Sequence, residues 1–294
     1  MSGDQFMQYL VSGLTQGSIY ALVALGFTII YAVTRIINFA QGEFVMIGGM
    51  LSFTLAVSYG IPLVPSLLLS VLGAAVIGIL LYLLAIRTAR RASVVSLIII
   101  TIGSAIFIRG IAGEVWGVDH VRPPFFTGYE SISFAGAYIH PQALWIMGTT
   151  ITVTVLLHLF LTYTMVGKAL KACAINPGAA GLVGINARTM GLIAFGLATA
   201  LGGIGGVVMA PLTLTAYNIG VLTGLKGFVA ASIGGFKSPI AAVIGGFTLG
   251  IVEALAVAVN WGPFTSAYKD AIAIIVLMLV LLIRSGTLAA EERT

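Results

Sequence analysis

Long apolar runs alternate with short polar segments along nearly the whole chain, and this alternation predicts helices that cross a membrane. A spanning helix needs about 20 apolar residues. Runs of about that length occupy residues 6–33, 44–59, 63–86, 94–113, 141–165, 190–210, 239–259 and 269–284. Residues 221–235 are also apolar, but they are few and interrupted by glycine, which fits a half-helix or re-entrant segment. We therefore expect an all-α, polytopic integral membrane protein, with residues 1–294 as a single transmembrane domain and a bundle of eight or nine transmembrane segments.

The composition supports this prediction. Hydrophobic residues make up 59% of the chain and charged residues only 8%, whereas a soluble domain carries roughly 25% charged residues. A chain with so few charges cannot keep its surface in water, so its outer surface must face lipid. Two longer polar stretches interrupt the apolar runs, at residues 114–140 and 166–190.

The basic residues predict which side of the membrane each segment faces, because Lys and Arg accumulate in cytoplasmic loops. With the amine end outside, ten of the 14 basic residues fall on the inner side. These are Arg35, Arg87, Arg90, Arg91, Lys168, Lys171, Arg188, Lys237, Arg284 and Arg293. We expect a periplasmic amine end, a cytoplasmic carboxyl end, a periplasmic loop at 114–140 and a cytosolic segment at 166–190. The net charge of +5 then needs no nucleic acid to explain it.

The motifs of common enzymes and metal sites do not occur in the sequence. The sequence has no G-x-x-x-x-G-K-[ST] segment to hold nucleotide phosphates and no H-E-x-x-H segment. Its three His residues lie apart and its one Cys has no partner for a disulfide or a metal cluster. We predict no catalytic residue, no metal and no cofactor, so any ATP-driven step must use a separate ATPase.

A polar segment at the start of the second apolar run is the first candidate site. Asn38, Gln41 and Glu43 lie within six residues, with Gly42 among them, and Asn38 and Gln41 share a face if the segment is helical. Polar groups at membrane depth are costly unless they pair or face water, so one interpretation is the lining of a solute pathway or a hinge. The other is a helix start at the interface, with Asn38 as N-cap and Glu43 in the first turns.

Glu253 is the most isolated charge, because it lies inside the apolar run 239–259. An unpaired carboxylate at the bilayer centre would cost roughly 2.5 kcal/mol or more. We expect either an ion pair, with Lys226 or Lys237, or a place in the solute pathway or near the interface. The glycine-rich rows 202–206 and 245–250 favour close helix packing.

The stretch 166–190 is too long for a tight turn, is rich in small residues, and contains the break Pro177-Gly178. Short surface helices of Ala and Gly bury little by themselves, which favours insertion into a groove of another protein. Ala179 and Gly184 are our candidates for the closest approach. A plain basic loop in the cytosol is the alternative.

Taken together, these pieces resemble the LivH-type permease subunit of branched-chain amino-acid ABC importers, from one end of the chain to the other. The matching pieces are 17–22, 37–43 (Ile-Asn-Phe-Ala-Gln-Gly-Glu), Gly167-Lys168 through Gly184-Ile185-Asn186, 225–228 with 233–235, and 268–270. The resemblance implies that residues 167–186 couple the permease to an ATPase. It also implies a second, LivM-like permease subunit, two cytosolic ABC ATPase subunits and a periplasmic amino-acid-binding protein as partners.

We therefore expect a permease subunit of an ABC importer, in a bacterial inner membrane, that moves branched-chain or related small amino acids by alternating access. The pathway residues would be Asn38, Gln41, Gly42, Glu43 and Glu253. The ATPase-coupling residues would be Gly167, Lys168, Ala179, Gly184, Ile185 and Asn186. Two other functions remain open at this point: a passive urea or amide channel, and an ion-coupled secondary transporter that uses Glu43 or Glu253.

Overall fold

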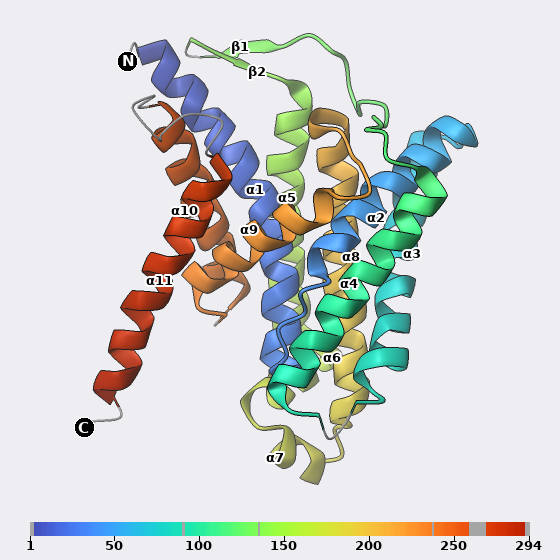
Figure 1. The fold of residues 1–294 in the computed structure, drawn as a ribbon, viewed down its shortest axis with the longest axis vertical. Coiled ribbons are helices and arrows are strands. Elements are labelled where there is room, and N and C mark those ends of the chain that lie inside the picture. The colour runs from blue at the N-terminus through green and yellow to red at the C-terminus, as the bar shows by residue number, and fades with distance from the viewer. Residues whose placement is uncertain (1–2, 90–91, 135, 237, 259–268, 292–294) are drawn as a thin grey trace.

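The computed structural model describes residues 3–89, 92–134, 136–236, 238–258 and 269–291, with side chains up to residue 282 (Figure 1). Its helices are α1 (Gly3–Thr34), α2 (Gln41–Phe53), α3 (Leu63–Leu81), α4 (Val94–Trp116), α5 (Pro141–Tyr163), α6 (Met165–Ile175), α7 (Pro177–Leu182), α8 (Ala187–Thr213), α9 (Ile219–Gly234), α10 (Pro239–Ala258) and α11 (Lys269–Glu291). Two π-helical turns, η1 (Thr54–Ser58) and η2 (Tyr82–Ile86), continue α2 and α3.

The expectation of an all-α, polytopic membrane protein is confirmed. Within the described residues, six helices are long and apolar enough to cross a membrane: α1, α3 with η2, α4, α5, α8 and α10. Helices suit this setting because every backbone N–H and C=O bonds within its own segment, as lipid requires. The short predicted segment 221–235 corresponds to α9, and the other predicted runs correspond to α2 with η1 and to α11.

The stretch 114–140 contains the main departure from the expected elements. α4 continues to Trp116, and a small hairpin follows, in which β1 (Ile132–Phe134) pairs antiparallel with β2 (Ala137–Ile139). Val121 and Thr215 exchange two backbone hydrogen bonds, which hold this stretch against the end of α8. Figure 1 shows the hairpin at the same end of the bundle as the start of α1, whereas α6 and α7 lie at the opposite end.

Helix α1 is the central helix, because all its residues from 17 to 30 are buried. It packs closely on α10 through small residues on both helices. A Cβ atom added to Gly17 would lie 2.9 Å from the carbonyl oxygen of Gly246, and one added to Gly250 would meet the backbone of Gly13 and Gly17. The predicted role of the glycines in close packing is therefore confirmed for this helix pair.

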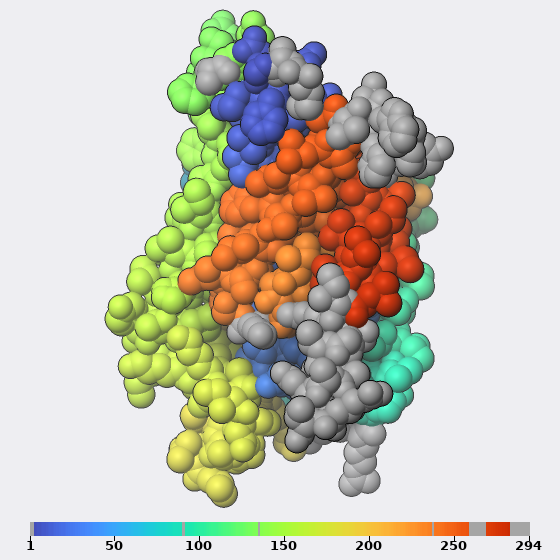
Figure 2. All heavy atoms as spheres, turned by 90° about the vertical axis from the view of Figure 1, so that its left-hand side faces the viewer, coloured from blue at the N-terminus to red at the C-terminus, as the bar shows by residue number. Residues whose placement is uncertain are grey.

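The outer helices α3, α4 and α5 bury few of their residues and expose many aliphatic ones. Such a surface fits contact with lipid. On the face shown in Figure 2, α10 and α11 lie side by side, and the segment with α6 and α7 forms the lower end of the molecule.

Candidate functional site

Helix α2 begins inside the bundle and not at its edge. After α1 ends at Thr34, residues 35–38 form an irregular segment, with a positive φ of 59° at Arg35, and lead back to mid-height, where α2 starts (Figure 1). Asn38 and Gln41 are fully buried, and Glu43 is 1% exposed. The N-cap of α2 is Ala40, and the side chain of Asn38 instead accepts a hydrogen bond from the Ala40 N–H at 3.2 Å. The expected N-cap role of Asn38 is therefore wrong, and its full burial does not fit an interfacial position, whereas Glu43 does lie in the first turn of α2.

Glu43 is paired with Arg109, which lies on α4. One carboxylate oxygen, Oε1, accepts from Arg109 Nη2 at 2.8 Å and from Nε at 3.2 Å. Arg109 is one of the four basic residues that the charge count places on the outer side, and the sequence analysis assigned it no other role, so this pairing was missed. A signal was present, because Arg109 lies inside the apolar run 94–113 and an ionisable residue inside a span is a functional candidate by default.

The remaining polar atoms of this segment are incompletely satisfied. Gln41 Nε2 donates to the carbonyl oxygen of Ala198 at 2.7 Å. Asn38 Nδ2, Gln41 Oε1 and Glu43 Oε2 have no hydrogen-bond partner among the described residues. Because buried polar atoms nearly always find a partner, three open atoms on one short segment make this segment the candidate site. We call Asn38, Gln41 and Glu43 the polar break.

Gly42 sets the distance between α2 and α9. A Cβ atom on Gly42 would lie 2.6 Å from the Cα of Gly224, and it would also meet the carbonyl oxygen of Gly220. Gly220 in turn lies against Glu43 Oε2. The backbone of α9 therefore forms one wall of the polar break, and Gly42 permits that contact.

Glu253 forms the predicted ion pair with Lys226. The Lys226 Nζ lies 3.1 Å from Glu253 Oε1 and 2.8 Å from Asp270 Oδ1. The hydroxyl of Tyr20 donates to Glu253 Oε2 at 2.8 Å, and Lys269 Nζ lies 3.9 Å from the same oxygen. The alternative partner, Lys237, is outside the described residues. Glu253 thus belongs to a second polar cluster, and helix α9 connects the two because it carries both Gly220 and Lys226.

The predicted coupling residues divide into exposed and structural ones. Lys168, Ala179 and Gly184 are exposed. Gly167 is buried where α6 meets the end of α5, since a Cβ there would meet Phe160 and Leu161.

Two further coupling candidates have structural contacts. Asn186 caps α8 by accepting from the N–H groups of Arg188 and Thr189. Ile185 is half-buried against the core. The break predicted at Pro177-Gly178 is confirmed, because α6 ends at Ile175 and Pro177 occupies the first turn of α7, which Asn176 caps.

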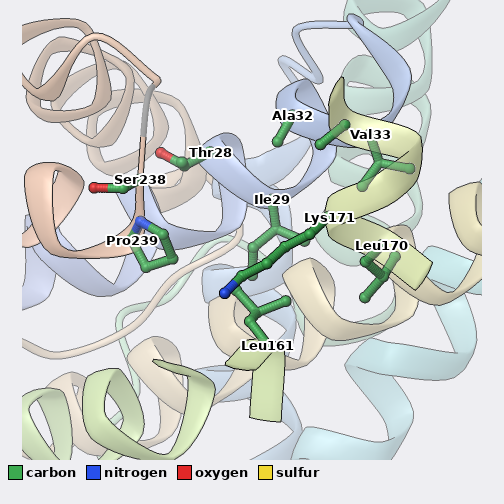
Figure 3. Close-up of a pocket in the computed structure, with 10 residues that line it drawn as sticks. Thr28, Ile29, Ala32, Val33, Leu161, Leu170, Lys171, Ser238 and Pro239 are labelled. Carbon is green, nitrogen blue, oxygen red and sulfur yellow. The ribbon is translucent and has the colours of Figure 1, made fainter. Parts of the chain in front are cut away.

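The sequence analysis did not predict that apolar side chains of the stretch 166–190 are exposed at its tip. Leu182 is 90% exposed and Ile175 84% exposed, and Met165 and Val183 are also largely exposed. Beside α6 lies a cavity of about 170 Å³, bordered by α1, α5 and the start of α10. Figure 3 shows the Lys171 side chain reaching along this cavity past Ile29 toward Leu161.

Comparison with known proteins shows which family the chain belongs to. The model of the family described as "Branched-chain amino acid transport system / permease component" matches residues 9–281. The chain is 33% identical over 302 residues to the high-affinity branched-chain amino acid transport system permease protein BraD of Pseudomonas aeruginosa, covering 98% of this chain and 97% of that one. It is also 33% identical over 304 residues to the permease protein LivH of Escherichia coli K12, with 98% and 96% covered.

Two more distant matches agree. A probable branched-chain amino acid transport permease protein LivH of Methanocaldococcus jannaschii is 28% identical over 292 residues, with 93% of this chain and 89% of that one covered. Among solved structures, PsaBC from Streptococcus pneumoniae in complex with Fab matches with a TM-score of 0.50 and 14% identity. That match covers 94% of this chain and 90% of the other, and it supports the fold alone.

A bundle of spanning helices around a buried polar segment fits a membrane transport protein, and the family match gives its class as permease. The family match is nearly as long as the chain, and the relatives cover it almost completely. The chain belongs to the family of permease components of branched-chain amino acid transport systems. This membership supports the permease function over the channel and the ion-coupled transporter, because the relatives are named as transport permease proteins.

Proposed function

We propose that this permease subunit moves branched-chain or related small amino acids past the polar break, in an ABC importer of a bacterial inner membrane. The observation that carries the proposal is the set of open polar atoms on Asn38, Gln41 and Glu43, buried where α2 starts. A solute with an ammonium group and a carboxylate offers both donors and acceptors to such atoms. The names of the relatives support the substrate class.

The energy would come from partners, because the sequence has no P-loop. We place the docking of two cytosolic ABC ATPase subunits at the α6–α7 segment and its equivalent on a second, LivM-like permease subunit. The exposed residues Lys168, Ala179 and Gly184, with the apolar tip at Leu182, support this placement. A periplasmic amino-acid-binding protein would deliver the solute at the opposite end.

The orientation follows from the placement of the charged segments. The start of α1 and the hairpin lie at one end of the bundle, and α6–α7 lie at the other with Lys168, Lys171 and Arg188 close in sequence (Figure 1). The excess of basic residues favours a cytoplasmic position for the α6–α7 end. The amine end would then be periplasmic and the carboxyl end cytoplasmic.

Transport would proceed by a shift between inward- and outward-facing populations. ATP can favour one state only if the docked ATPases contact the two states differently. The cavity beside α6 leaves room for this helix to move against α1 and α10. Helix α9 would carry the change to the polar break, because it packs on Gly42 and pairs with Glu253.

The test is uptake of labelled leucine by proteoliposomes that contain the whole complex. Asn38→Ala and Glu43→Gln each remove a polar partner, and the loss of one charged hydrogen bond, about 1.5–3 kcal/mol, predicts a fall in uptake of about tenfold or more. Ser70→Ala is the matched control, because buried Ser70 bonds only the carbonyl of Ser66 on its own helix. It should leave uptake near the wild-type level.

Energy coupling provides the second readout of the same assay. Uptake should require ATP and should persist when the proton gradient is collapsed. Uptake without ATP would support a channel, and loss of uptake on collapsing the gradient would support an ion-coupled transporter. Either result would contradict the proposal.

A further inference from the structure

A second cavity lies beside the Lys226 cluster, apart from the polar break. It has a volume of about 280 Å³ and lies between α1, α8, α9 and the start of α11. Lys226, Lys269 and Asp270 line it together with Tyr20, while Ile19 and Leu222 belong to its apolar wall. None of five cavities in the described part of the chain is lined by Asn38, Gln41 or Glu43, so this cavity and the polar break are distinct places.

The charges around this cavity balance. Lys226 and Lys269 contribute two positive charges, and Glu253 and Asp270 contribute two negative ones. Glu253 is fully buried and does not line the cavity, whereas the side chain of Asp270 is 53% exposed. Glu253 and Tyr20 therefore hold Lys226 in place, Glu253 from outside the cavity and Tyr20 from its wall. Asp270 pairs with Lys226 at 2.8 Å, but its side chain and that of Lys269 are the more exposed charged groups, so they are the ones that a solute can reach.

We infer that this cavity binds the zwitterionic head group of a free amino acid before the amino acid reaches the polar break. The carboxylate would lie at Lys226 and Lys269, the ammonium at Asp270, and the aliphatic side chain against Ile19 and Leu222. This inference rests on the proposed function, since it names the residues that recognise that same substrate class.

Charge and size both favour a zwitterion over other solutes. A simple anion would be attracted by the two lysines but repelled by the carboxylate of Asp270. A simple cation would be attracted by Asp270 but repelled by the lysines. A solute with both charges satisfies both partners at once. Drug-sized ligands occupy pockets of about 300–1,000 Å³, so a cavity of about 280 Å³ suits a small solute.

The position of the cavity connects it to the polar break. Gly220, which touches Glu43, and Lys226, which pairs with Glu253, are six residues apart on α9, or about 9 Å along the helix axis. Because an α-helix has about 3.6 residues per turn, the two residues face different sides of α9, and the helix itself links the cavity to the polar break.

Protection of a single cysteine tests the binding directly. Leu222 lines the cavity and is 48% exposed, so Leu222→Cys in a Cys173→Ala background should react with a maleimide in the purified complex. The amino acid that the wild-type complex imports should slow this reaction by a factor of 1 + [L]/Kd, which is about tenfold at about ten times Kd. Isocaproate lacks the ammonium and isoamylamine lacks the carboxylate, so neither should protect at the same concentration.

The control cysteine lies in another cavity. Ile36→Cys, in the same background, lines the cavity near Arg87 and Arg188, and its alkylation should not respond to the amino acid. Equal protection at both positions would mean a global change of conformation and would overturn the assignment. Absence of protection at Leu222→Cys, in a complex that imports the same amino acid, would also overturn it and would leave the proposed function standing.

Kinetics give an independent readout. Asp270→Asn should raise the KM for uptake about tenfold, because a charged hydrogen bond to the ammonium is lost, while Asp270→Glu should stay close to wild type. Asp270 is half-exposed, so the variant should fold. If Asp270→Asn leaves KM unchanged, the ammonium does not bind here. If the wild-type complex imports no amino acid at all, it is the proposed function that fails.

Discussion

Arg109 donates two hydrogen bonds to a single oxygen of Glu43, at 2.8 and 3.2 Å, and leaves the other carboxylate oxygen against Gly220 without a partner among the described residues. The pair therefore holds the carboxylate in one orientation while it keeps one oxygen available. Helix α4 supplies the arginine, α2 the carboxylate and α9 the glycine. The polar break exists only because three helices distant in sequence meet there.

Removing the arginine should destabilise the protein more than removing both charges. Arg109→Leu leaves the buried Glu43 carboxylate unpaired, which typically costs about 3–5 kcal/mol, whereas replacing both partners by apolar residues is often close to neutral. The double variant Arg109→Leu/Glu43→Leu should therefore unfold at a higher temperature than Arg109→Leu alone, yet should transport no better. Thermal unfolding of the purified complex, with uptake in parallel, checks this. A double variant as unstable as the single one would mean that the ion pair is not the source of the loss.

Gly42 should tolerate no side chain. Gly42→Ala forces a Cβ atom against Gly224 and Gly220 of α9, and such overpacking costs about 1–3 kcal/mol. Gly110→Ala on α4 is the matched control, because nothing lies within 4 Å of a Cβ atom there. That control should be neutral or stabilising by up to about 1 kcal/mol, since alanine suits a helix interior better than glycine. Equal unfolding midpoints for the two variants would contradict the close contact between α2 and α9.

The sequence predicted the spanning helices well because each needs a long apolar run, and such runs are visible without tertiary information. It could not place the start of α2. Residues 35–43 have the composition of an interfacial segment, and only the contacts of Glu43 with Arg109 and of Gln41 with the Ala198 carbonyl reveal their depth. The Lys226–Glu253 pair was predictable, because two opposite charges inside apolar runs need partners.

The surface features were harder to predict, for a physical reason. The strands β1 and β2 have three residues each, too few to show a period-two pattern. The exposed positions of Leu182 and Ile175 depend on which face of α6 and α7 is buried, and that is set by Leu170, Cys173 and Ala180 packing on the bundle. The sequence did contain one signal for these exposed positions, because Leu182 and Ile175 are apolar residues in a stretch that we expected in the cytosol.

Single cysteines can test the orientation. The native Cys173 is a poor reporter, because it is 1% exposed and burial raises the pKa of its thiol. The reactive form is the thiolate, so Cys173 should be alkylated more slowly at neutral pH than a free thiol and should gain rate only at higher pH. Leu182→Cys and Tyr129→Cys, in a Cys173→Ala background, replace side chains that are 90% and 74% exposed.

An impermeant maleimide should label Tyr129→Cys in intact spheroplasts and Leu182→Cys only in inside-out vesicles. The reverse pattern would invert the proposed orientation. Labelling of both variants in spheroplasts would place the hairpin and the α6–α7 segment on one side, against the arrangement in Figure 1. Labelling should be repeated without the ATPases, which would cover Leu182 if they dock there.

The final prediction concerns the proposed docking of the ATPase at α7. Ala179 is small and exposed, so a bulky residue there should meet a tightly packed partner and cost about 1–3 kcal/mol. That cost is comparable to a typical coupling free energy between two sites, about 1–3 kcal/mol. Ala179→Trp should therefore abolish ATP-driven uptake, or detach the ATPase, while the permease still inserts in the membrane.

Gly148→Trp is the matched control for this variant. Gly148 is exposed on α5, and nothing lies within 4 Å of a Cβ atom added there. A tryptophan side chain at this position should therefore extend into the surrounding lipid without a clash. Uptake, stimulation of ATP hydrolysis by the loaded binding protein, and co-purification of the ATPase should all stay near wild type in the control. If Ala179→Trp behaves like Gly148→Trp in all three measurements, α7 does not contact the ATPase at Ala179. The ATPase could then still contact the exposed side chain of Leu182, and Leu182→Asp would test that contact by the same three measurements.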